Sequence, residues 1–257
     1  MNNLDTLIEN GLVVTENEIG HLNIGIKDGK IAYLGDENLN AEFKINASDL
    51  IVLPGGIDPH VHVDQPSGDD VIMADNFQSA TKSAAAGGNT TILPFAMQIK
   101  GQSLRKCVED YHKKAQGNMY IDTSFHLIIS DPTPQVLGQE LPALSKDGYT
   151  SFKVFMTYDD LVLNDKELIE VFDVAKQLKT LVMVHAEGYD SIKYLSDKFE
   201  KEGKTAPYYH APTRPQIVER EATHRAISHA QIVDIPLMIV HVSGEEALNQ
   251  IRWAKDK

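Results

Sequence analysis

The sequence predicts an α/β fold: a barrel of parallel strands and covering helices, incomplete at about six strand–helix units, preceded by a small all-β portion. Three observations predict it. After Pro54, apolar strand-like runs alternate with amphipathic helical patterns, which is typical of a parallel sheet with right-handed crossovers. No Gly-x-Gly-x-x-Gly follows a strand, which removes the main support for an open dinucleotide-binding sheet. Ionisable residues instead follow several different strands, as expected at the C-terminal face of a (β/α)8 barrel.

Composition limits the classes of function. The chain has 257 residues, with 24 Lys and Arg against 37 Asp and Glu, so its formal net charge is −13. Such an acidic chain is a poor candidate for binding nucleic acid or an anionic membrane. The single cysteine, Cys107, rules out an intrachain disulfide and fits a reducing compartment. There is no signal-peptide pattern and no run of about 18 apolar residues, so we expect a cytoplasmic protein.

Residues 1–52 are expected to form a first, all-β domain. They contain several short strand-like runs, a hairpin turn at Asp28-Gly29 and no convincing helix. These strands are too few to close a sandwich comfortably. The expected strands lie at residues 12–14, 21–26, 30–34 and 43–45.

Residues 53–257 are expected to form the barrel domain, truncated after its sixth strand. Helix starts are marked by residues that cap well, Asp75, Ser103 and Asn164 or Asp165, and several ends by glycine. The six strands are expected at residues 50–53, 90–93, 121–129, 151–156, 181–184 and 237–240. The helices are expected at residues 75–86, 103–115, 134–146, 165–178, 189–202, 215–231 and 245–255.

Two histidines separated by one residue, His60 and His62, follow the apolar run at residues 50–53. If the strand continues, both point to the same face, because side chains alternate with a period of two. Such a pair is half of a metal site, although it also occurs as ordinary polar residues at a strand end. His185 and His241 each follow four apolar residues and should emerge at the same rim. Four histidines converging there favour a metal centre.

Lys153 lies inside an apolar strand-like run, where a charged amine is costly unless it is paired or neutral. One interpretation is an ion pair with a neighbouring carboxylate. The other is a neutral amine that reacts with carbon dioxide to form a carbamate, an anion whose two oxygens can bridge two metal ions. Imidazoles with such a bridge suit zinc, with manganese, iron, cobalt or nickel as alternatives. Two ions about 3.5–4 Å apart can share a hydroxide that is nucleophilic at neutral pH.

Tyr158 lies just past the end of the Lys153 strand. Its phenol could donate a hydrogen bond to a developing oxyanion. A tyrosine in a loop is, however, more often a packing residue.

Together these residues resemble the amidohydrolase superfamily, and within it the dihydropyrimidinases and hydantoinases, which hydrolyse cyclic amides. The resemblance runs along essentially the whole chain. It implies a TIM-like (β/α)8 metal-dependent hydrolase barrel paired with a β-sandwich built from both chain termini. The matching motifs are PGGIDPHVHVD at residues 54–64, FKVFMTY at 152–158, VHAE at 184–187 and VHVSG at 240–244.

The resemblance also implies roles for single residues. His60 and His62 would bind one metal ion, His185 and His241 the other, and carbamylated Lys153 would bridge the two. Tyr158 would be the catalytic and substrate-binding residue, hydrogen-bonded to the substrate carbonyl and to the tetrahedral intermediate. The implied reaction is ring opening of a dihydropyrimidine or hydantoin to an N-carbamoyl amino acid by the hydroxide between the metals. A dimer or tetramer is implied for a full-length relative.

Other readings stay open. Asp64 stands where dihydroorotases carry an arginine for the substrate carboxylate, which disfavours that activity. An allantoinase-like hydrolase of cyclic ureides fits less well, and a non-catalytic dihydropyrimidinase-related scaffold would be expected to have lost metal ligands. A mononuclear deaminase would leave Lys153 unexplained.

The resemblance also has a gap. The family barrel has eight strands and a metal-binding aspartate on the eighth, whereas this sequence reaches only a sixth strand. We therefore expect the chain to be an incomplete part of a longer enzyme, with weak or no turnover alone.

Overall fold

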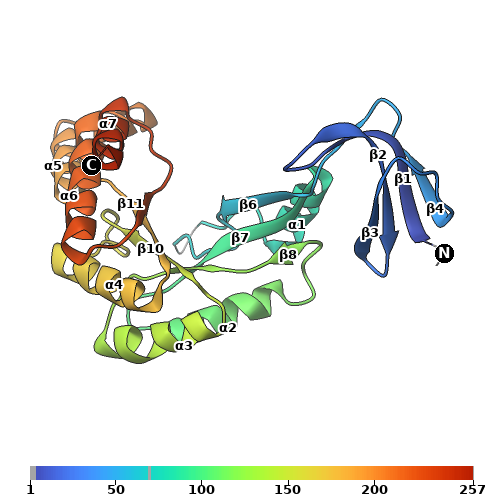
Figure 1. Cartoon of the computed structure of the whole chain (residues 1–257). Coiled ribbons are helices and arrows are strands. Elements are labelled where there is room, and N and C mark those ends of the chain that lie inside the picture. Colours follow the sequence, from blue (N-terminus) through green and yellow to red (C-terminus); the bar gives the residue numbers. More distant parts are fainter. Residues whose placement is uncertain (1–3, 69–70, 257) are drawn as a thin grey trace. The chain divides into compact units, whose positions relative to one another are not determined.

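The computed structural model describes residues 4–68 and 71–256. Contacts between Cα atoms divide the chain into two compact units, Met1–Gly56 and Ile57–Lys257. Each unit contains its own sheet, and the elements of both are labelled in Figure 1.

The first unit is a five-stranded mixed sheet with the order β3-β2-β1-β4, in which β5 also pairs with β1. β2 is antiparallel to β1 and β3, whereas β4 and β5 are parallel to β1. The sequence predicted strands throughout this region, and its described residues indeed form no helix. The strands are β1 (Leu4–Val14), β2 (Ile19–Lys27), β3 (Lys30–Gly35), β4 (Ala41–Asn46) and β5 (Ile51–Val52).

Two local features explain this sheet. Asp28 and Gly29 both have positive φ, 50° and 71°, as a two-residue hairpin turn between β2 and β3 requires. Strand β1 begins well before the expected residues 12–14. Asn10, with φ of 67°, lies in an irregularity of the β1–β2 register. That irregularity interrupts the alternating pattern, so only the second half of β1 reads as a strand.

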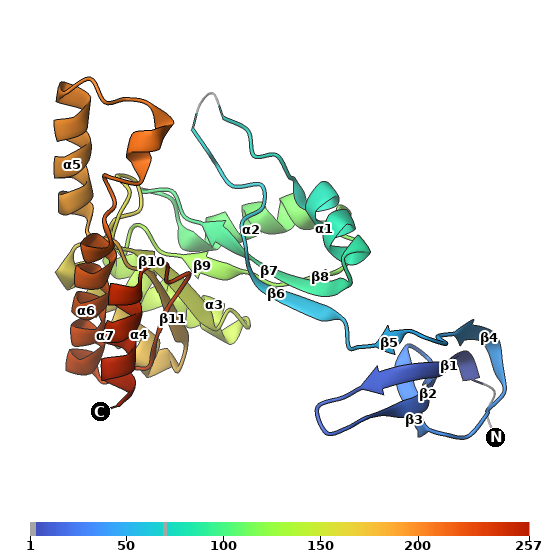
Figure 2. The same ribbon diagram turned by 90° about the horizontal axis from the view of Figure 1, so that it is seen from above.

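The second unit holds a seven-stranded sheet with the order β12-β11-β10-β9-β7-β6, and β8 pairs with β7. The pairs from β7 to β12 are parallel, as the alternation of strands and helices predicted. Figure 2 shows β6, β7 and β8 running side by side. The strands are β6 (Gly56–Val61), β7 (Asn89–Met97), β8 (Asp122–Thr123), β9 (His126–Ile128), β10 (Ser151–Phe155), β11 (Leu181–His185) and β12 (Leu237–Ile239).

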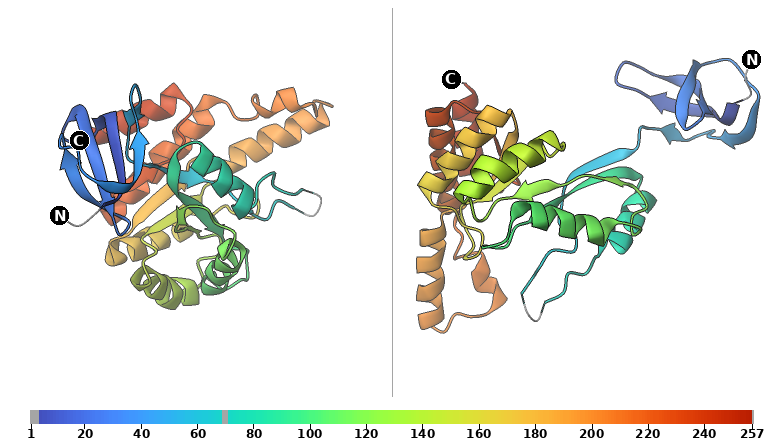
Figure 3. Two further views of the ribbon diagram at one scale, coloured as in Figure 1. Left: turned by 90° about the vertical axis from the view of Figure 1, so that its right-hand side faces the viewer. Right: turned by 90° about the horizontal axis from the view of Figure 1, so that it is seen from below.

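Helices cover this sheet in chain order. α1 and α2 contact β7, α3 contacts α4, and α6 lies between α4 and α7. Figure 3 shows these helices following one another along the sheet. The helices are α1 (Phe77–Ala86), α2 (Leu104–Ala115), the π-helix η1 (Val136–Glu140), α3 (Leu141–Lys146), α4 (Asp165–Leu178), α5 (Tyr189–Lys201), the 3-10 helix η2 (Pro207–His210), α6 (Gln216–Val233) and α7 (Glu245–Lys255).

The two faces of the sheet carry different residues. Phe152 and Val154 of β10 belong to the large core between the sheet and the helices. Phe155 belongs to a small cluster on the opposite face, with Phe95 and Met183 among its members. Because side chains alternate along a strand, Lys153 shares this second face, the face opposite the helices.

Three sequence expectations need correction. Residues 51–52 pair with β1 of the first unit, so the strand that leads to the histidines is β6 and His60 lies within it. The cap of α1 is Asn76, whose side chain accepts from the Ser79 amide at 3.0 Å. The expected strand at 121–129 is two short strands, because residues 124–125 pair with neither neighbour.

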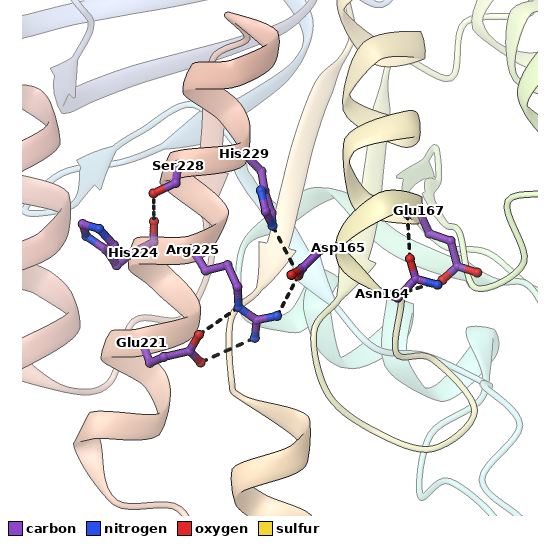
Figure 4. A network of polar contacts seen from close by, with 8 residues as sticks. All are labelled: Asn164, Asp165, Glu167, Glu221, His224, Arg225, Ser228 and His229. Atoms are coloured by element: carbon purple, nitrogen blue, oxygen red, sulfur yellow. Dashed lines mark hydrogen bonds and ion pairs between the residues drawn. The ribbon is translucent and has the colours of Figure 1, made fainter.

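A charged network joins α4 to α6 (Figure 4). Arg225 on α6 donates from Nη1 to Asp165 at 2.7 Å and from Nε to Glu221 at 2.8 Å. The His229 ring lies 3.2 Å from the same Asp165 carboxylate. Arg225 is one-third exposed, so the network should contribute modestly to stability.

We expect Arg225→Ala to lower the free energy of unfolding by about 1 kcal/mol, because it removes the ion pairs of Arg225 with Asp165 and with Glu221. Urea unfolding measures this change. Glu221→Ala is the matched control, since it removes only the pair within α6 and should cost about half as much. Equal losses in the two variants would contradict a role for Arg225 between the helices.

No helix among the described residues is both long and apolar enough to cross a membrane.

Candidate metal centre

β6 and the residue after it carry the first pair of histidines. The ring centroids of His60 and His62 are 5.5 Å apart. Both rings pack on Phe95 of β7, His60 edge-on at 4.7 Å and His62 stacked at 4.9 Å. The phenyl ring is completely buried and therefore gives both imidazoles a rigid surface to pack against.

Gln65 fixes the orientation of the His62 ring. Its Nε2 donates to the Phe95 carbonyl at 3.0 Å, so its Oε1 faces His62 as an acceptor, 2.8 Å from Nδ1. Nδ1 of His62 must then carry the proton, because an amide oxygen cannot donate. The Nε2 lone pair of His62 is left available to a metal ion.

Lys153 lies beneath the histidines in β10. Its side chain is 0% exposed, and its Nζ has no hydrogen-bond partner among the described residues. Two aromatic rings lie beside the amine: Nζ is 5.1 Å from the ring centroids of both Phe95 and Phe155. Within residues 4–68 and 71–256, the ion pair considered for this lysine is therefore not formed.

Burial lowers the pKa of Lys153 to about 7, so the amine is largely uncharged at slightly alkaline pH. A neutral buried amine is the form that can react with carbon dioxide.

His185 and His241 form the second pair. His185 ends β11 and His241 lies two residues after β12, with ring centroids 4.5 Å apart. The His241 ring is also 5.4 Å from that of His60, so the two pairs meet. His241 has φ of 38°, in the left-handed region, and strain of this kind is concentrated at functional sites.

Glu219 of α6 holds this strained segment. Its carboxylate accepts from the Ser243 amide at 2.8 Å and from the Gly244 amide at 2.6 Å. These two charge-assisted bonds fix the backbone that follows His241, at the start of α7.

His60, His62 and His241 are held in their neutral form. Burial, followed by the nearby Lys153 charge, lowers the pKa of His60 to about 4. Burial, then His185 and Lys153, lowers the pKa of His241 to about 4. Burial also lowers the pKa of His62. Neutral imidazoles present the lone pairs that a metal ion needs.

The structure thus brings together all five predicted ligands, although their side chains do not already have the arrangement of a metal site. Within residues 4–68 and 71–256, no three His, Cys, Asp or Glu side chains are grouped so as to hold a metal ion. The arrangement consists of two histidine pairs around one unpaired amine.

Tyr158 lies at the edge of this cluster. Its ring centroid is 5.2 Å from that of His185, its side chain is 42% exposed, and its φ is 71°. An exposed phenol on a constrained loop beside the histidines can contact a small molecule bound there.

Sequence reasoning missed His126, which supports the site from β9. Its Nε2 donates to the Pro59 carbonyl at 2.8 Å, so its Nδ1 accepts from the Ser151 hydroxyl at 2.5 Å. His126 is nearly buried, and it fixes the backbone directly before His60. A single histidine within the run 121–129 gave no signal of this role.

We expect His126→Ala to lower the free energy of unfolding by about 1–2 kcal/mol, because it removes a nearly buried side chain together with its hydrogen bonds to the Pro59 carbonyl and the Ser151 hydroxyl. Urea unfolding of the metal-free chain measures the loss. Ser151→Ala is the control, since it removes only the second bond and should cost about 1 kcal/mol. An unchanged midpoint for His126→Ala would show that the histidine does not support β6.

Comparison with known proteins defines the class. A model of the amidohydrolase family matches residues 51–242, and this chain belongs to that family. It is 46% identical to a D-hydantoinase from Ralstonia pickettii over 99% of this chain and 55% of the relative. It is 36% identical to a dihydropyrimidinase from Rattus norvegicus, over 97% of this chain and 49% of that protein.

The fold agrees with this similarity. A solved D-hydantoinase structure superposes with a TM-score of 0.95 at 46% identity, covering 98% of this chain and 55% of the other. The resemblance to hydantoinases and dihydropyrimidinases expected from the motifs is confirmed. The chain spans about half the length of the curated relatives it matches.

Proposed function

We propose that this chain carries the metal-binding portion of a cyclic-amide hydrolase of the hydantoinase and dihydropyrimidinase type. The observation that carries the proposal is the Nζ of Lys153, fully buried and without a hydrogen-bond partner among the described residues, beside two histidine pairs. The similarity to hydantoinases supports the substrate class.

The donor set fits two divalent metal ions. His60 and His62 would hold one ion, His185 and His241 the other, and a carbamate on Lys153 would lie between them. Burying an amine without a hydrogen-bond partner costs free energy, and conversion to a metal-bound carbamate would remove that cost. Imidazole and carboxylate-like donors favour zinc. When bound, the ions would polarise an amide carbonyl and acidify a water molecule.

The chain's own side chains would position the substrate. Tyr158 would donate its phenolic hydrogen to the carbonyl oxygen of the ring and to the oxyanion that develops there. Its exposure and its place beside His185 suit a group that meets the substrate directly. The products would be N-carbamoyl amino acids, formed by opening a hydantoin or dihydropyrimidine ring.

The parallel sheet would be part of a (β/α)8 barrel. β12 ends the sheet order, and beside it a cavity of about 600 Å³ is lined mainly by apolar residues of β12, α6 and α7, among them Ile227, Leu237, Ile239 and Ile251. A further strand–helix segment would cover this surface. In the first unit, Phe43 is 63% and Ile45 51% exposed, as expected if more strands were needed to form a sandwich. Assembly into a homo-oligomer remains a prediction.

A chimera tests the function. This chain is joined to the remaining length of the Ralstonia pickettii D-hydantoinase and assayed on hydantoin, dihydrouracil and allantoin. We expect ring opening of hydantoin and dihydrouracil by the chimera, none by its Lys153→Ala variant, and little or none by the 257-residue chain alone. A folded, metal-loaded chimera that opens none of these rings would refute the proposal, and preference for allantoin would redirect it to cyclic ureides.

A further inference from the structure

Glu187 lies two residues after His185 and is neither a proposed metal ligand nor a proposed substrate contact. Its Oε2 lies 2.7 Å from Nε2 of His185, and both side chains are largely buried, at 19% and 13% exposed. Nδ1 of His185 has no hydrogen bond to any residue that the structure describes. One nitrogen of the ring is thus occupied by a carboxylate and the other is free.

Two contacts keep Glu187 in place. Its Oε1 faces the guanidinium of Arg214 at 3.9 Å. The next amide, of Gly188, donates to the Val218 carbonyl of α6 at 3.2 Å. Glu187 and Arg214 also line a cavity of about 210 Å³ together with His185 and His241. The carboxylate is therefore held between the His185 ring and the Arg214 guanidinium.

The hydrogen-bonding capacities of the two side chains determine the tautomer of His185. An ionised carboxylate can only accept, so Nε2 of His185 carries the proton and the lone pair is on Nδ1. Ligating histidines typically donate their other ring hydrogen to a carboxylate or carbonyl, which fixes the ring and raises its basicity. Gln65 makes the corresponding contact to His62, through the opposite nitrogen.

We propose that Glu187 is the positioning residue for His185: it fixes the proton on Nε2 and presents Nδ1 as the metal-binding nitrogen, with Arg214 holding the carboxylate. This inference rests on the proposed function for its metal, but the tautomer is a property of the metal-free chain. Glu187 acts through His185 and need not touch the substrate.

The first experiment measures zinc affinity, by competition with a chromophoric chelator in bicarbonate buffer. We expect Glu187→Ala to lower the affinity for one of the two zinc ions by about 10–100-fold and to leave the affinity for the other unchanged. Glu187→Gln keeps an acceptor oxygen and should lose less than about tenfold. The matched control is Glu200→Ala, an exposed glutamate on α5, which should bind both ions as the unmodified chain does.

The second experiment reads the tautomer directly, by long-range ¹H–¹⁵N NMR of the histidines in the metal-free chain. We expect His185 to be protonated on Nε2 in the unmodified chain and to become a mixture of tautomers in Glu187→Ala. A His185 protonated on Nδ1, a tautomer unaffected by Glu187→Ala, or unchanged zinc affinity in that variant would overturn the inference. If the unmodified chain bound no zinc, the proposed function would fail, while the tautomer measurement would still decide the role of Glu187.

Discussion

Replacing Lys153 with methionine is expected to stabilise the metal-free chain by a few kcal/mol near pH 7. The reason is that burial lowers the pKa of Lys153 from 10.5 to about 7, and each pKa unit corresponds to ~1.4 kcal/mol. Methionine has a similar length and no charge to desolvate, so it removes this cost without leaving a large cavity. Urea unfolding in buffer free of carbon dioxide, with a chelator present, measures the gain.

The gain should shrink as the pH rises. Between pH 7 and about 10, the unfolded chain keeps a proton on Lys153 that the folded chain has lost. Stability of the unmodified chain therefore rises with pH through this window, relative to the methionine variant. Burial raises the pKa of Cys107 to about 12, but that thiol is present in both chains and cancels. A difference between the two chains that did not change with pH would show that Lys153 is not neutral in the folded state.

The second large effect is expected at Phe95. We expect Phe95→Ala to lower the free energy of unfolding by about 3–5 kcal/mol, because it empties a completely buried position. The same ring packs against His60, His62 and His126. Without it, the imidazoles of the first histidine pair would lose the surface that orients them. Thermal unfolding of the metal-free chain measures the stability, and zinc titration measures the site.

Phe95→Leu is the control for Phe95→Ala. It keeps most of the buried volume and should cost about 1–2 kcal/mol, with partial retention of zinc binding. If Phe95→Ala bound zinc as tightly as the unmodified chain, packing on the Phe95 ring would not be needed to orient the histidines.

Much of the second unit was predictable because its signals are local. Ser103 was predicted as one helix cap, and Asn164 or Asp165 as another. The side chains of Ser103 and Asn164 accept from the Lys106 and Glu167 amides at 3.3 and 3.0 Å. A capping side chain acts within four residues, so it can be found in a sequence. Asp75 was the wrong choice for α1, because Asn76 beside it caps equally well in principle and only the backbone geometry decides.

The site was predictable in part for a different reason. Parallel strands end at one rim, so the positions of His185 and His241 after apolar runs were sufficient to predict that they meet. The supporting residues gave no such signal. Gln65 acts on His62 through the backbone of Phe95, 30 residues away, and Glu219 holds the backbone 24 and 25 residues further along. Contacts of this kind depend on the three-dimensional packing of separate elements.

The most direct test of the metal centre is the number of metal ions bound per chain, measured by elemental analysis after zinc loading with and without bicarbonate. We expect two zinc ions per chain when bicarbonate is present, and fewer in buffer free of carbon dioxide or when Lys153 is replaced by methionine. Two ions bound regardless of bicarbonate and of Lys153, or no zinc bound under any condition, would contradict this expectation.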